Sequence, residues 1–335
     1  EALLAAAYSP NNATIYVGAF HQAPVLLDAA TFMRLDASAQ SPAFRSVREI
    51  VISPDGESIA VSGPPAQRNE WSVSICDRNG AIRQPDIGAG GHPAFSSDSR
   101  LVAVGQDEHT LAICDVQTGE RVRSFTIADA MIGALCWSAD NTELIVGCSD
   151  GSVRVLDAQS GACTRRFDAH SSAIRQVLLT PQQDVLLTTC PEAPSIKAWS
   201  WPSGALRFDI TEAADPQSIA ISPDAQRLIS GGWTKTLLLW DLQSGRRITT
   251  VGTTSGGIRS VPFSPDGRSI IAACDDHALR VWETSRPSAV ALEGRYLRDV
   301  ERGRNRRDLL ELDRETLSEI HDVPRAVIDA RHDPP

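Results

Sequence analysis

What this sequence has little of excludes several classes of protein. No apolar run approaches the roughly 18 residues that a membrane span needs, so we expect no membrane partner. The net charge is −10 and the pI is near 5.2, whereas a nucleic-acid-binding protein needs a basic surface to displace counterions. Only two of the 32 basic residues are lysine, a bias that a GC-rich genome would explain. We therefore predict no nucleic-acid partner.

Motifs that carry chemistry are also missing. The seven cysteines are scattered, none forms Cys-x-x-Cys, and no histidine lies nearby at metal-ligand spacing. There is no P-loop, no Gly-x-Gly-x-x-Gly after a strand and no plausible pair of carboxylates. We predict no enzymatic activity, cofactor, metal or small-molecule substrate. Unpaired thiols favour a cytoplasmic location. Because the chain starts at Glu1 rather than Met, any signal peptide would already have been removed.

What the sequence does contain is a four-residue turn signal, Ser-Pro-Asp-Gly in its clearest form, that recurs seven times. The copies are separated by 44, 43, 42, 42, 42 and 42 residues. They begin at Ser9, Ser53, Ser96, Ser138, Thr180, Ser222 and Ser264. A constant period of this length is typical of a repeat architecture and favours one large domain over two.

The last repeat shows the plan most clearly. Its composition and alternation predict four strands, over residues 258–263, 269–274, 279–283 and 289–293. The third strand of the preceding repeat ends in Trp240-Asp241. Four short strands with tight turns fill the whole period, so no helix fits inside a repeat.

The period, the Ser-Pro-Asp-Gly turns and the Trp-Asp pair resemble the WD-repeat family of β-propellers. The resemblance covers residues 1–294 and implies an all-β fold with seven four-stranded antiparallel blades around a central channel. In that family a His, a Ser or Thr, an Asp and a Trp form a hydrogen-bonded tetrad in each blade. In the fifth repeat His170, either Thr188 or Thr189, and Trp199 could supply three members, but Ala193 stands where Asp is expected. Asp150 and Asp276 occupy the Asp position of the fourth and seventh repeats, which lack the His. We expect most blades to rely on apolar packing and the ring to close between complete blades, or with help from the tail.

One sequence match to an enzyme motif is false on structural grounds. Residues 147–151 fit the Gly-x-Ser-x-Gly nucleophile elbow around Ser149, but that mechanism needs a strand-to-helix turn. Here the segment joins two predicted strands. His92, His109 and His277 belong to different repeats, so only convergence at the channel mouth would let them share a metal.

Aligning the repeats on the turn signal yields the candidate site. The positions five residues before each signal are Leu4, Arg48, Gly91, Gly133, Arg175, Gln217 and Arg259. The resemblance places this position on the first strand near the channel rim, on the face usually used for partners. Three arginines there would focus positive potential and match a carboxylate or phosphate. The alternative is that each arginine pairs with an acid such as Glu49, Glu192 or Asp275.

A second aligned position lies on the turn between the second and third strands. It holds Phe20, Asn69, Asp107, Ser149, Glu192, Trp233 and Asp275. Trp233 is unusual in a polar turn, so we interpret it as a contact residue, or else as a cover for a neighbouring blade. The predicted partner-binding residues are Arg48, Arg175, Gln217, Arg259, Trp233, Glu192 and Asp275.

Residues 295–335 break the repeat. They hold nine arginines and ten acids, and residues 308–322 carry leucines and an isoleucine roughly along one side of a predicted short helix. This tail either packs on the propeller or serves as a linker or docking helix. The sequence predicts a non-catalytic scaffold that binds an acidic or phosphorylated protein or peptide on the channel-mouth face. The alternative is a sensor or regulatory propeller domain of a larger multidomain protein, such as a kinase or an NTPase.

Overall fold

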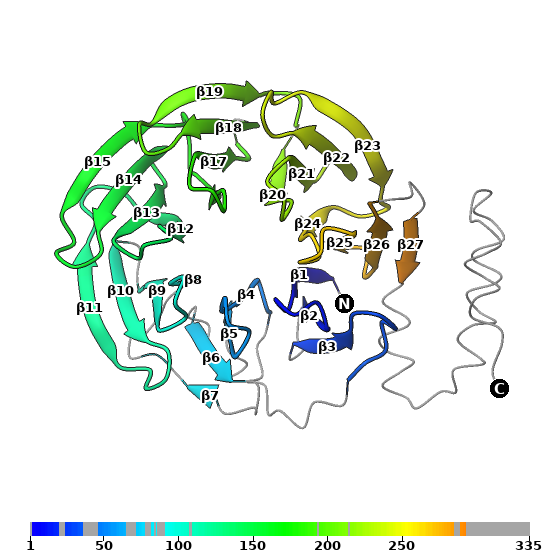
Figure 1. Cartoon of the computed structure of the whole chain (residues 1–335), viewed down its shortest axis with the longest axis horizontal. Coiled ribbons are helices and arrows are strands. Elements are labelled where there is room, and N and C mark those ends of the chain that lie inside the picture. Colours follow the sequence, from blue (N-terminus) through cyan, green and yellow to red (C-terminus); the bar gives the residue numbers. More distant parts are fainter. Residues whose placement is uncertain are drawn as a thin grey trace.

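Seven antiparallel sheets stand around a central axis in the computed structural model, each forming one blade of a propeller (Figure 1). The structure describes residues 2–19, 24–35, 46–64, 72–77, 82–83, 85, 91–106, 109–192, 194–213, 215–284 and 289–292. No helix occurs in these ranges, and the predicted fold class is confirmed. The expected tail helix lies outside the described residues.

Consecutive strands build each blade, with the first strand innermost. Blade one contains β1 (Leu3–Tyr8), β2 (Thr14–Ala19) and β3 (Val25–Asp28), and blade two contains β4 (Glu49–Ile52), β5 (Ser58–Gly63), β6 (Ser72–Asp77) and β7 (Ile82–Arg83). Blade three contains β8 (Gly91–Phe95), β9 (Leu101–Gly105), β10 (Thr110–Asp115) and β11 (Arg121–Thr126), and blade four contains β12 (Ile132–Trp137), β13 (Glu143–Cys148), β14 (Ser152–Asp157) and β15 (Cys163–Asp168). Blade five contains β16 (Gln176–Leu179), β17 (Val185–Cys190), β18 (Ser195–Ser200) and β19 (Ala205–Ile210), and blade six contains β20 (Pro216–Ile221), β21 (Arg227–Gly232), β22 (Thr236–Asp241) and β23 (Arg247–Thr253). Blade seven contains β24 (Ile258–Ser260), β25 (Ser269–Cys274), β26 (Leu279–Glu283) and β27 (Ala289–Leu292).

The apolar core lies between neighbouring blades. Leu111 and Ile113 of blade three pack with Ile132 and Leu144 of blade four in one buried cluster, and similar clusters join other blade pairs. Inner strands such as β13 are deeply buried, whereas outer strands such as β15 alternate between exposed and half-buried residues. A blade cannot bury both of its faces alone, so each one depends on its neighbours.

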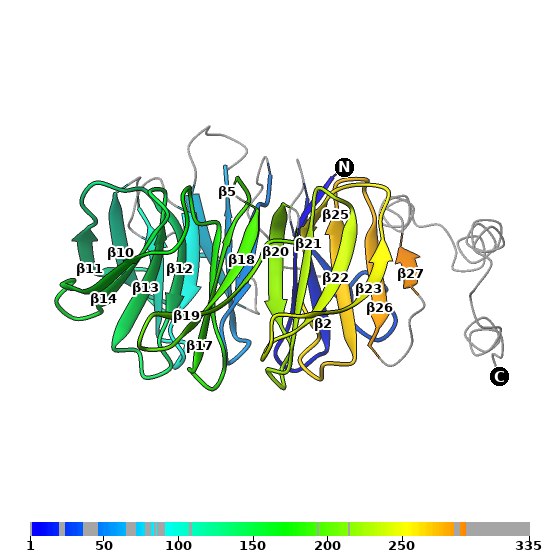
Figure 2. The same ribbon diagram turned by 90° about the horizontal axis from the view of Figure 1, so that it is seen from above.

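The ring closes between blade one and blade seven. Leu3 and Ile15 pack with Ile271 and Leu279 in one buried cluster. The Ser260 hydroxyl also donates to the Ala6 carbonyl oxygen across this junction at 3.2 Å. The two blades lie side by side at the N-terminus (Figures 1 and 2). In the described residues β1 belongs to the sheet of blade one and not to that of blade seven, so the ring closes at a blade boundary without a strand shared between the chain ends. The predicted help from the tail concerns residues outside the described ranges.

The turn signals form one rim of the channel, called here the lower rim. In every blade, the hydroxyl of the first signal residue donates to a nearby carboxylate or amide oxygen at 2.5–2.8 Å. The same hydroxyl accepts the backbone N–H five residues later at 2.9–3.1 Å. The fourth signal residue has a positive φ in all seven copies, from 53° at Ala225 to 75° at Gly56. The repeated sequence therefore encodes one repeated turn.

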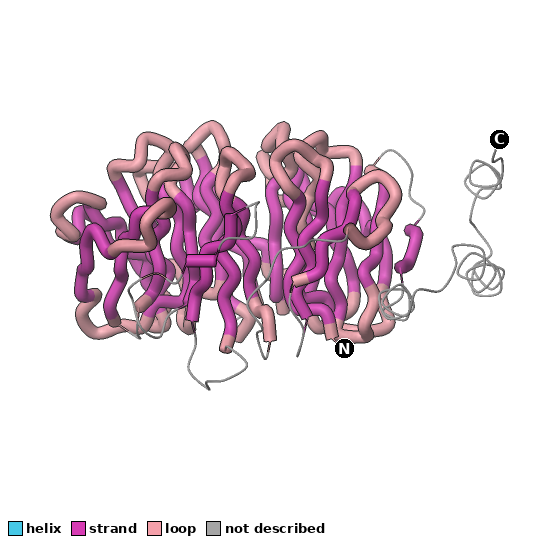
Figure 3. Tube along the Cα trace, turned by 90° about the horizontal axis from the view of Figure 1, so that it is seen from below, coloured by secondary structure: helices cyan, strands magenta, loops and turns pink. Residues whose placement is uncertain are grey.

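Neighbouring turns are also linked around the lower rim. The backbone N–H groups of Ser97 and Ala139 donate to Asn141 Oδ1 and Gln183 Oε1 of the next blade, at 2.8 and 3.0 Å. Where the second signal residue is proline it has no N–H to donate. In blade one that residue is Pro10, and it faces Gly56 of blade two instead. Loops gather at the two ends of the blades, which leaves two rims available for contacts (Figure 3).

Blade five retains more of the hydrogen-bonded tetrad than the sequence predicts. His170 Nε2 and Trp199 Nε1 both reach the Thr188 hydroxyl, at 2.8 and 3.0 Å. The fourth member is Ser195, whose hydroxyl contacts His170 Nδ1 at 3.2 Å. Ala193, where Asp was expected, lies outside the described residues. Burial lowers the pKa of His170 to about 4, so this histidine is neutral at pH 7.

Other blades depart further from the tetrad. In blade six, Trp240 Nε1 donates to the Ser230 hydroxyl at 2.8 Å, whereas the buried Trp282 Nε1 of blade seven has no acceptor within the described part of the chain. Asp150 and Asp276 occupy the family's Asp position, and each pairs with an arginine four residues later, at 3.0 and 2.6 Å. Apolar packing and local ion pairs thus replace the missing tetrads.

Candidate binding site at the channel mouth

A cavity of about 1320 Å³ occupies the centre of the propeller. It is lined by residues of all seven blades, mainly from the innermost strands. All seven residues of the first aligned position line it: Leu4, Arg48, Gly91, Gly133, Arg175, Gln217 and Arg259. Each lies within one residue of the start of its strand, at the end of the channel opposite the lower rim. This end is called here the upper mouth. A spacing counted in the sequence thus corresponds to a ring in space.

Three arginines of this ring act on one another electrostatically. Arg175 is half-buried, and burial lowers its pKa. The positive charges of Arg48 and Arg259 lower it further, and Glu49 and Asp215 oppose them only in part. Because all three residues line one cavity, their positive charges add at its mouth. The upper mouth is therefore a place of positive potential in a protein that is acidic overall.

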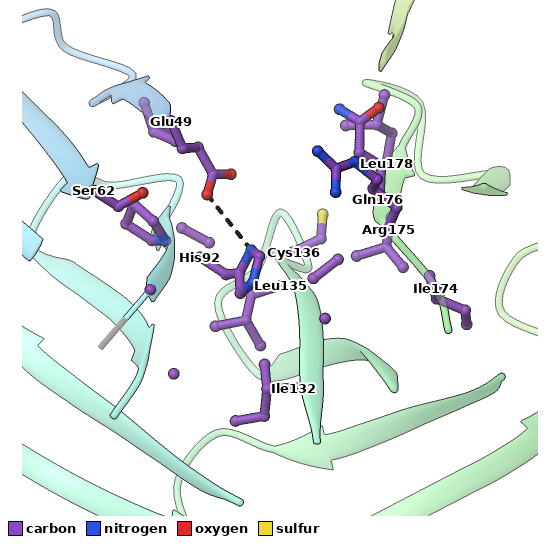
Figure 4. A pocket seen from close by; sticks show the side chains of 18 of the residues that line it. Glu49, Ser62, His92, Ile132, Leu135, Cys136, Ile174, Arg175, Gln176 and Leu178 are labelled. Carbon is purple, nitrogen blue, oxygen red and sulfur yellow. Dashed lines mark ion pairs between the residues drawn. The ribbon is translucent and has the colours of Figure 1, made fainter. Parts of the chain in front are cut away.

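Of the three acids that could neutralise these arginines, Glu49 and Glu192 contact other side chains, whereas Asp275 acts on Arg259 through its charge. Glu49 Oε2 lies 3.6 Å from His92 Nδ1, and Glu192 accepts a hydrogen bond from the Ser172 hydroxyl. Figure 4 shows Glu49 and His92 on one side of the cavity and Arg175 on the other. Among the residues that the structure describes, neither Arg175 nor Arg259 has an acidic partner within 4.0 Å.

Arg259 is held by an aromatic ring instead. Its Cζ lies 4.0 Å from the centre of the Trp233 ring, which belongs to blade six and is 43% exposed. Burial lowers the pKa of Arg259, while the negative charge of Asp275 raises it. The Arg259 Nε atom is buried and has no hydrogen-bond partner in the described structure. Trp233 thus covers the neighbouring blade and also presents an exposed face beside the mouth.

The remaining predicted site residues divide into two groups. Glu192 lines the cavity, as does Ser149 of the same aligned position, whereas Asp275 and Trp233, which packs on Arg259, do not. Gln217 lines the cavity but is only 9% exposed, and its side-chain amide donates to Asp215 Oδ1 at 2.7 Å. Gln217 therefore has little freedom to bind a partner directly. The second aligned position in blades one to three, Phe20, Asn69 and Asp107, lies outside the described residues.

Several residues at the mouth were not among those that the sequence predicted to bind a partner. Shifting the same alignment by one residue finds Glu49, His92 and Gln176, all of which line the cavity. Gln176 also joins blades, because its Oε1 accepts the backbone N–H of Ile219 at 2.8 Å. Met131 is 42% exposed at the same rim. Its position in a turn of blade four gave no repeat signal.

Below the polar mouth the cavity wall is mostly apolar. Figure 4 shows Ile132, Leu135 and Leu178 around it, together with the thiol of Cys136. Burial raises the pKa of that thiol to about 11, so it is not a nucleophile at pH 7. The cavity thus combines a charged rim with an uncharged interior.

The false elbow around Ser149 is a turn between two strands, as the sequence indicated. Ser149 lies in the turn between β13 and β14, and its hydroxyl accepts the backbone N–H of Met131 at 2.9 Å. Of the three histidines considered as metal ligands, only His92 lines the cavity. In the described ranges no group of three or more His, Cys, Asp or Glu is arranged to hold a metal ion. Within the same ranges no helix is suited to cross a membrane.

Comparison with known families identifies the repeats. The profile of the family described as "WD domain, G-beta repeat" matches residues 212–241 and 245–283. The profile described as "Anaphase-promoting complex subunit 4 WD40 domain" matches residues 126–182. The matched segments fall in blades that the structure shows to be regular and four-stranded. The chain belongs to the WD-repeat family. WD-repeat propellers generally serve as non-catalytic interaction scaffolds.

Individual relatives of this WD-repeat propeller are distant. Periodic tryptophan protein 2 of Arabidopsis thaliana is 27% identical over 222 residues, which cover 63% of this chain and 23% of that protein. The B-type cell cycle switch protein ccs52B of Medicago truncatula is 22% identical over 237 residues, which cover 68% of this chain and 47% of that protein. The chain thus spans less than half the length of either relative. A chain in the crystal structure of the mitotic checkpoint complex matches with a TM-score of 0.70 at 18% identity, covering 84% of this chain and 90% of that chain.

Proposed function

We propose that this WD-repeat propeller is a non-catalytic scaffold that binds an acidic or phosphorylated protein or peptide across the upper mouth. The observation that carries the proposal is the cluster of Arg48, Arg175 and Arg259 at one end of the cavity. Because arginine matches carboxylate and phosphate groups bidentately, such a cluster selects acidic partners. The cytoplasm, where seven free cysteines stay reduced, is the expected location.

Trp233 supplies the second part of the proposed contact surface. A half-exposed tryptophan packed on an arginine offers a rigid apolar face beside charged donors, which is typical of interface hot spots. Relatives such as ccs52B and the structurally similar chain of the mitotic checkpoint complex carry names that refer to cell-cycle machinery. They support a protein partner in general terms and leave its identity open.

Affinity capture with the whole chain tests this proposal. We expect Arg175→Gln to reduce the yield of captured partners by about tenfold or more, because a hydrogen bond to a charged group contributes roughly 1.5–3 kcal/mol. Trp233→Ala should reduce it as well. The matched control is Arg247→Gln, which removes an exposed arginine from the outer strand of blade six. If both mouth variants retain every partner of the wild type, the upper mouth is not the binding surface.

A regulatory propeller domain within a larger multidomain protein is the second candidate. The observation that favours it is the greater length of the relatives, of which the matched region covers 23% and 47%. The sequence of the complete gene tests it: a contiguous catalytic domain supports this candidate, and an open reading frame without one contradicts it.

A further inference from the structure

We infer that the upper mouth contains an oxyanion site, centred on Arg175, that holds one phosphate group of a phosphorylated side chain. This inference rests on the proposed function for the source of the phosphate, which the partner carries. The site itself is a property of this chain. It is defined by Arg175 and Arg259, with the charge of Arg48 added from blade two.

The two central arginines occupy equivalent positions in blades five and seven. Gln217 stands between them in blade six, and all three side chains line the same cavity. The side-chain amide of Gln217 donates to Asp215 Oδ1 at 2.7 Å. The position between the two arginines is therefore polar but adds no charge. An anion that enters the mouth therefore meets donors from both sides.

The two central arginines, Arg175 and Arg259, have donors that the described part of the protein does not use. A guanidinium group carries five N–H donors. In the described structure the Arg175 side chain has no hydrogen-bond or ion-pair partner, and the buried Nε of Arg259 has none either. The ring of Trp233, 4.0 Å from Arg259 Cζ, fixes the guanidinium plane without occupying its N–H groups. Trp233 is thus a positioning residue for Arg259.

The charge balance favours phosphate over a single carboxylate. Arg48, Arg175 and Arg259 line one cavity, and burial first, then the positive charges of Arg48 and Arg259, lower the pKa of Arg175, although Glu49 and Asp215 oppose them. A phosphate ester carries about −1.5 to −2 charges and three acceptor oxygens at pH 7, so it can neutralise more than one guanidinium group. A carboxylate brings one charge and leaves the repulsion partly uncompensated. The cavity, with a volume of about 1320 Å³, has room for the side chain that carries the group.

Thermal unfolding in inorganic phosphate tests the site without any partner. At constant ionic strength set with potassium chloride, we expect the unfolding midpoint of the wild type to rise with phosphate and to saturate, since a ligand that binds only the folded state stabilises it. Arg175→Gln should weaken the phosphate dependence at least about tenfold, and Arg48→Gln, at an exposed position, should weaken it less. Arg247→Gln should behave as the wild type. A midpoint that follows only the chloride control, or an equal response of Arg175→Gln, overturns the inference.

Phosphatase treatment of the lysate before capture tests the source. Loss of the captured partners supports a phosphate carried on protein, and unchanged capture overturns it. The two proposals fail differently. Capture that depends on Arg175 without any phosphate response contradicts the oxyanion site and leaves the scaffold function standing. A saturable phosphate response without loss of capture in Arg175→Gln contradicts the scaffold surface and leaves the site standing.

Discussion

The lower rim and the upper mouth lie on the same inner strands, yet they differ in how strictly the blades repeat. At the lower rim all seven blades use the same pair of hydroxyl hydrogen bonds and the same positive φ. At the upper mouth the equivalent positions hold leucine, glycine, glutamine and arginine. Each first strand must enter the same turn to build a blade, whereas its other end carries no such requirement. The residues that repeat in every blade are therefore those that folding requires. The positions that vary are those at which the chain can acquire a contact with a partner.

Acidification should have the largest effect on the stability that the lower rim provides, because it acts on several of its turns at once. The serine hydroxyl bond lowers the pKa of Asp98, Asp140, Asp224 and Asp266 below the ordinary value of 3.8. A carboxyl whose pKa is depressed by folding contributes stability above its unfolded pKa and loses it as pH falls through the folded pKa. We therefore expect the urea midpoint to fall steeply below about pH 4. A midpoint that is constant from pH 5 to pH 2 would contradict this role of the turns.

Removing one lower-rim hydroxyl should have the next largest effect. Ser264 is fully buried, donates to Asp266 at 2.6 Å and accepts from the Ser269 N–H at 2.9 Å. In Ser264→Ala the Ser269 N–H loses its acceptor, so we expect a loss of about 1–3 kcal/mol in the free energy of unfolding. Urea unfolding measures it, with the exposed Ser171→Ala as the control. Equal stability of the two variants would show that the turn hydroxyl is dispensable.

Restoring the consensus residue in one turn should have a smaller effect, in the opposite direction. Ala225 has a φ of 53°, which is unfavourable for a residue with a Cβ, so Ala225→Gly should stabilise the protein by about 1 kcal/mol. Asn141→Gly should bring no such gain, because Asn141 Oδ1 accepts the Ser97 N–H of the neighbouring blade at 2.8 Å. Thermal unfolding distinguishes the two substitutions. An equal gain in both would show that the links between turns add nothing.

The sequence predicted the regular parts of the fold well, because spacing reports position along the repeat. The predicted second and third strands of blade seven coincide with β25 (Ser269–Cys274) and β26 (Leu279–Glu283). The first strand is shorter than predicted. β24 ends at Ser260, just before Pro262, which has no N–H for a ladder, and Phe263 forms only an isolated bridge.

The candidate site was predicted in outline only. The alignment brought the arginines to one cavity, but it could not show that Trp233 packs on Arg259 of the next blade or that Gln217 is held by Asp215. Both contacts depend on the direction of a side chain, which spacing does not determine. Spacing also failed to predict that Ser195 completes the tetrad of blade five, because this contact too depends on the direction of a side chain. Ser195 lies two residues beyond the position that the family pattern indicates.

The central claim is that the lower rim stabilises the fold while the upper mouth binds the partner. The most direct measurement compares Arg175→Gln with Ser264→Ala for both the unfolding midpoint and the yield of captured partners, under conditions in which both variants are folded. We predict that Arg175→Gln keeps the midpoint of the wild type, or exceeds it through relief of charge repulsion, and loses capture. Ser264→Ala should lower the midpoint and keep capture. If Arg175→Gln captures partners as the wild type does while folded Ser264→Ala does not, the claim is contradicted.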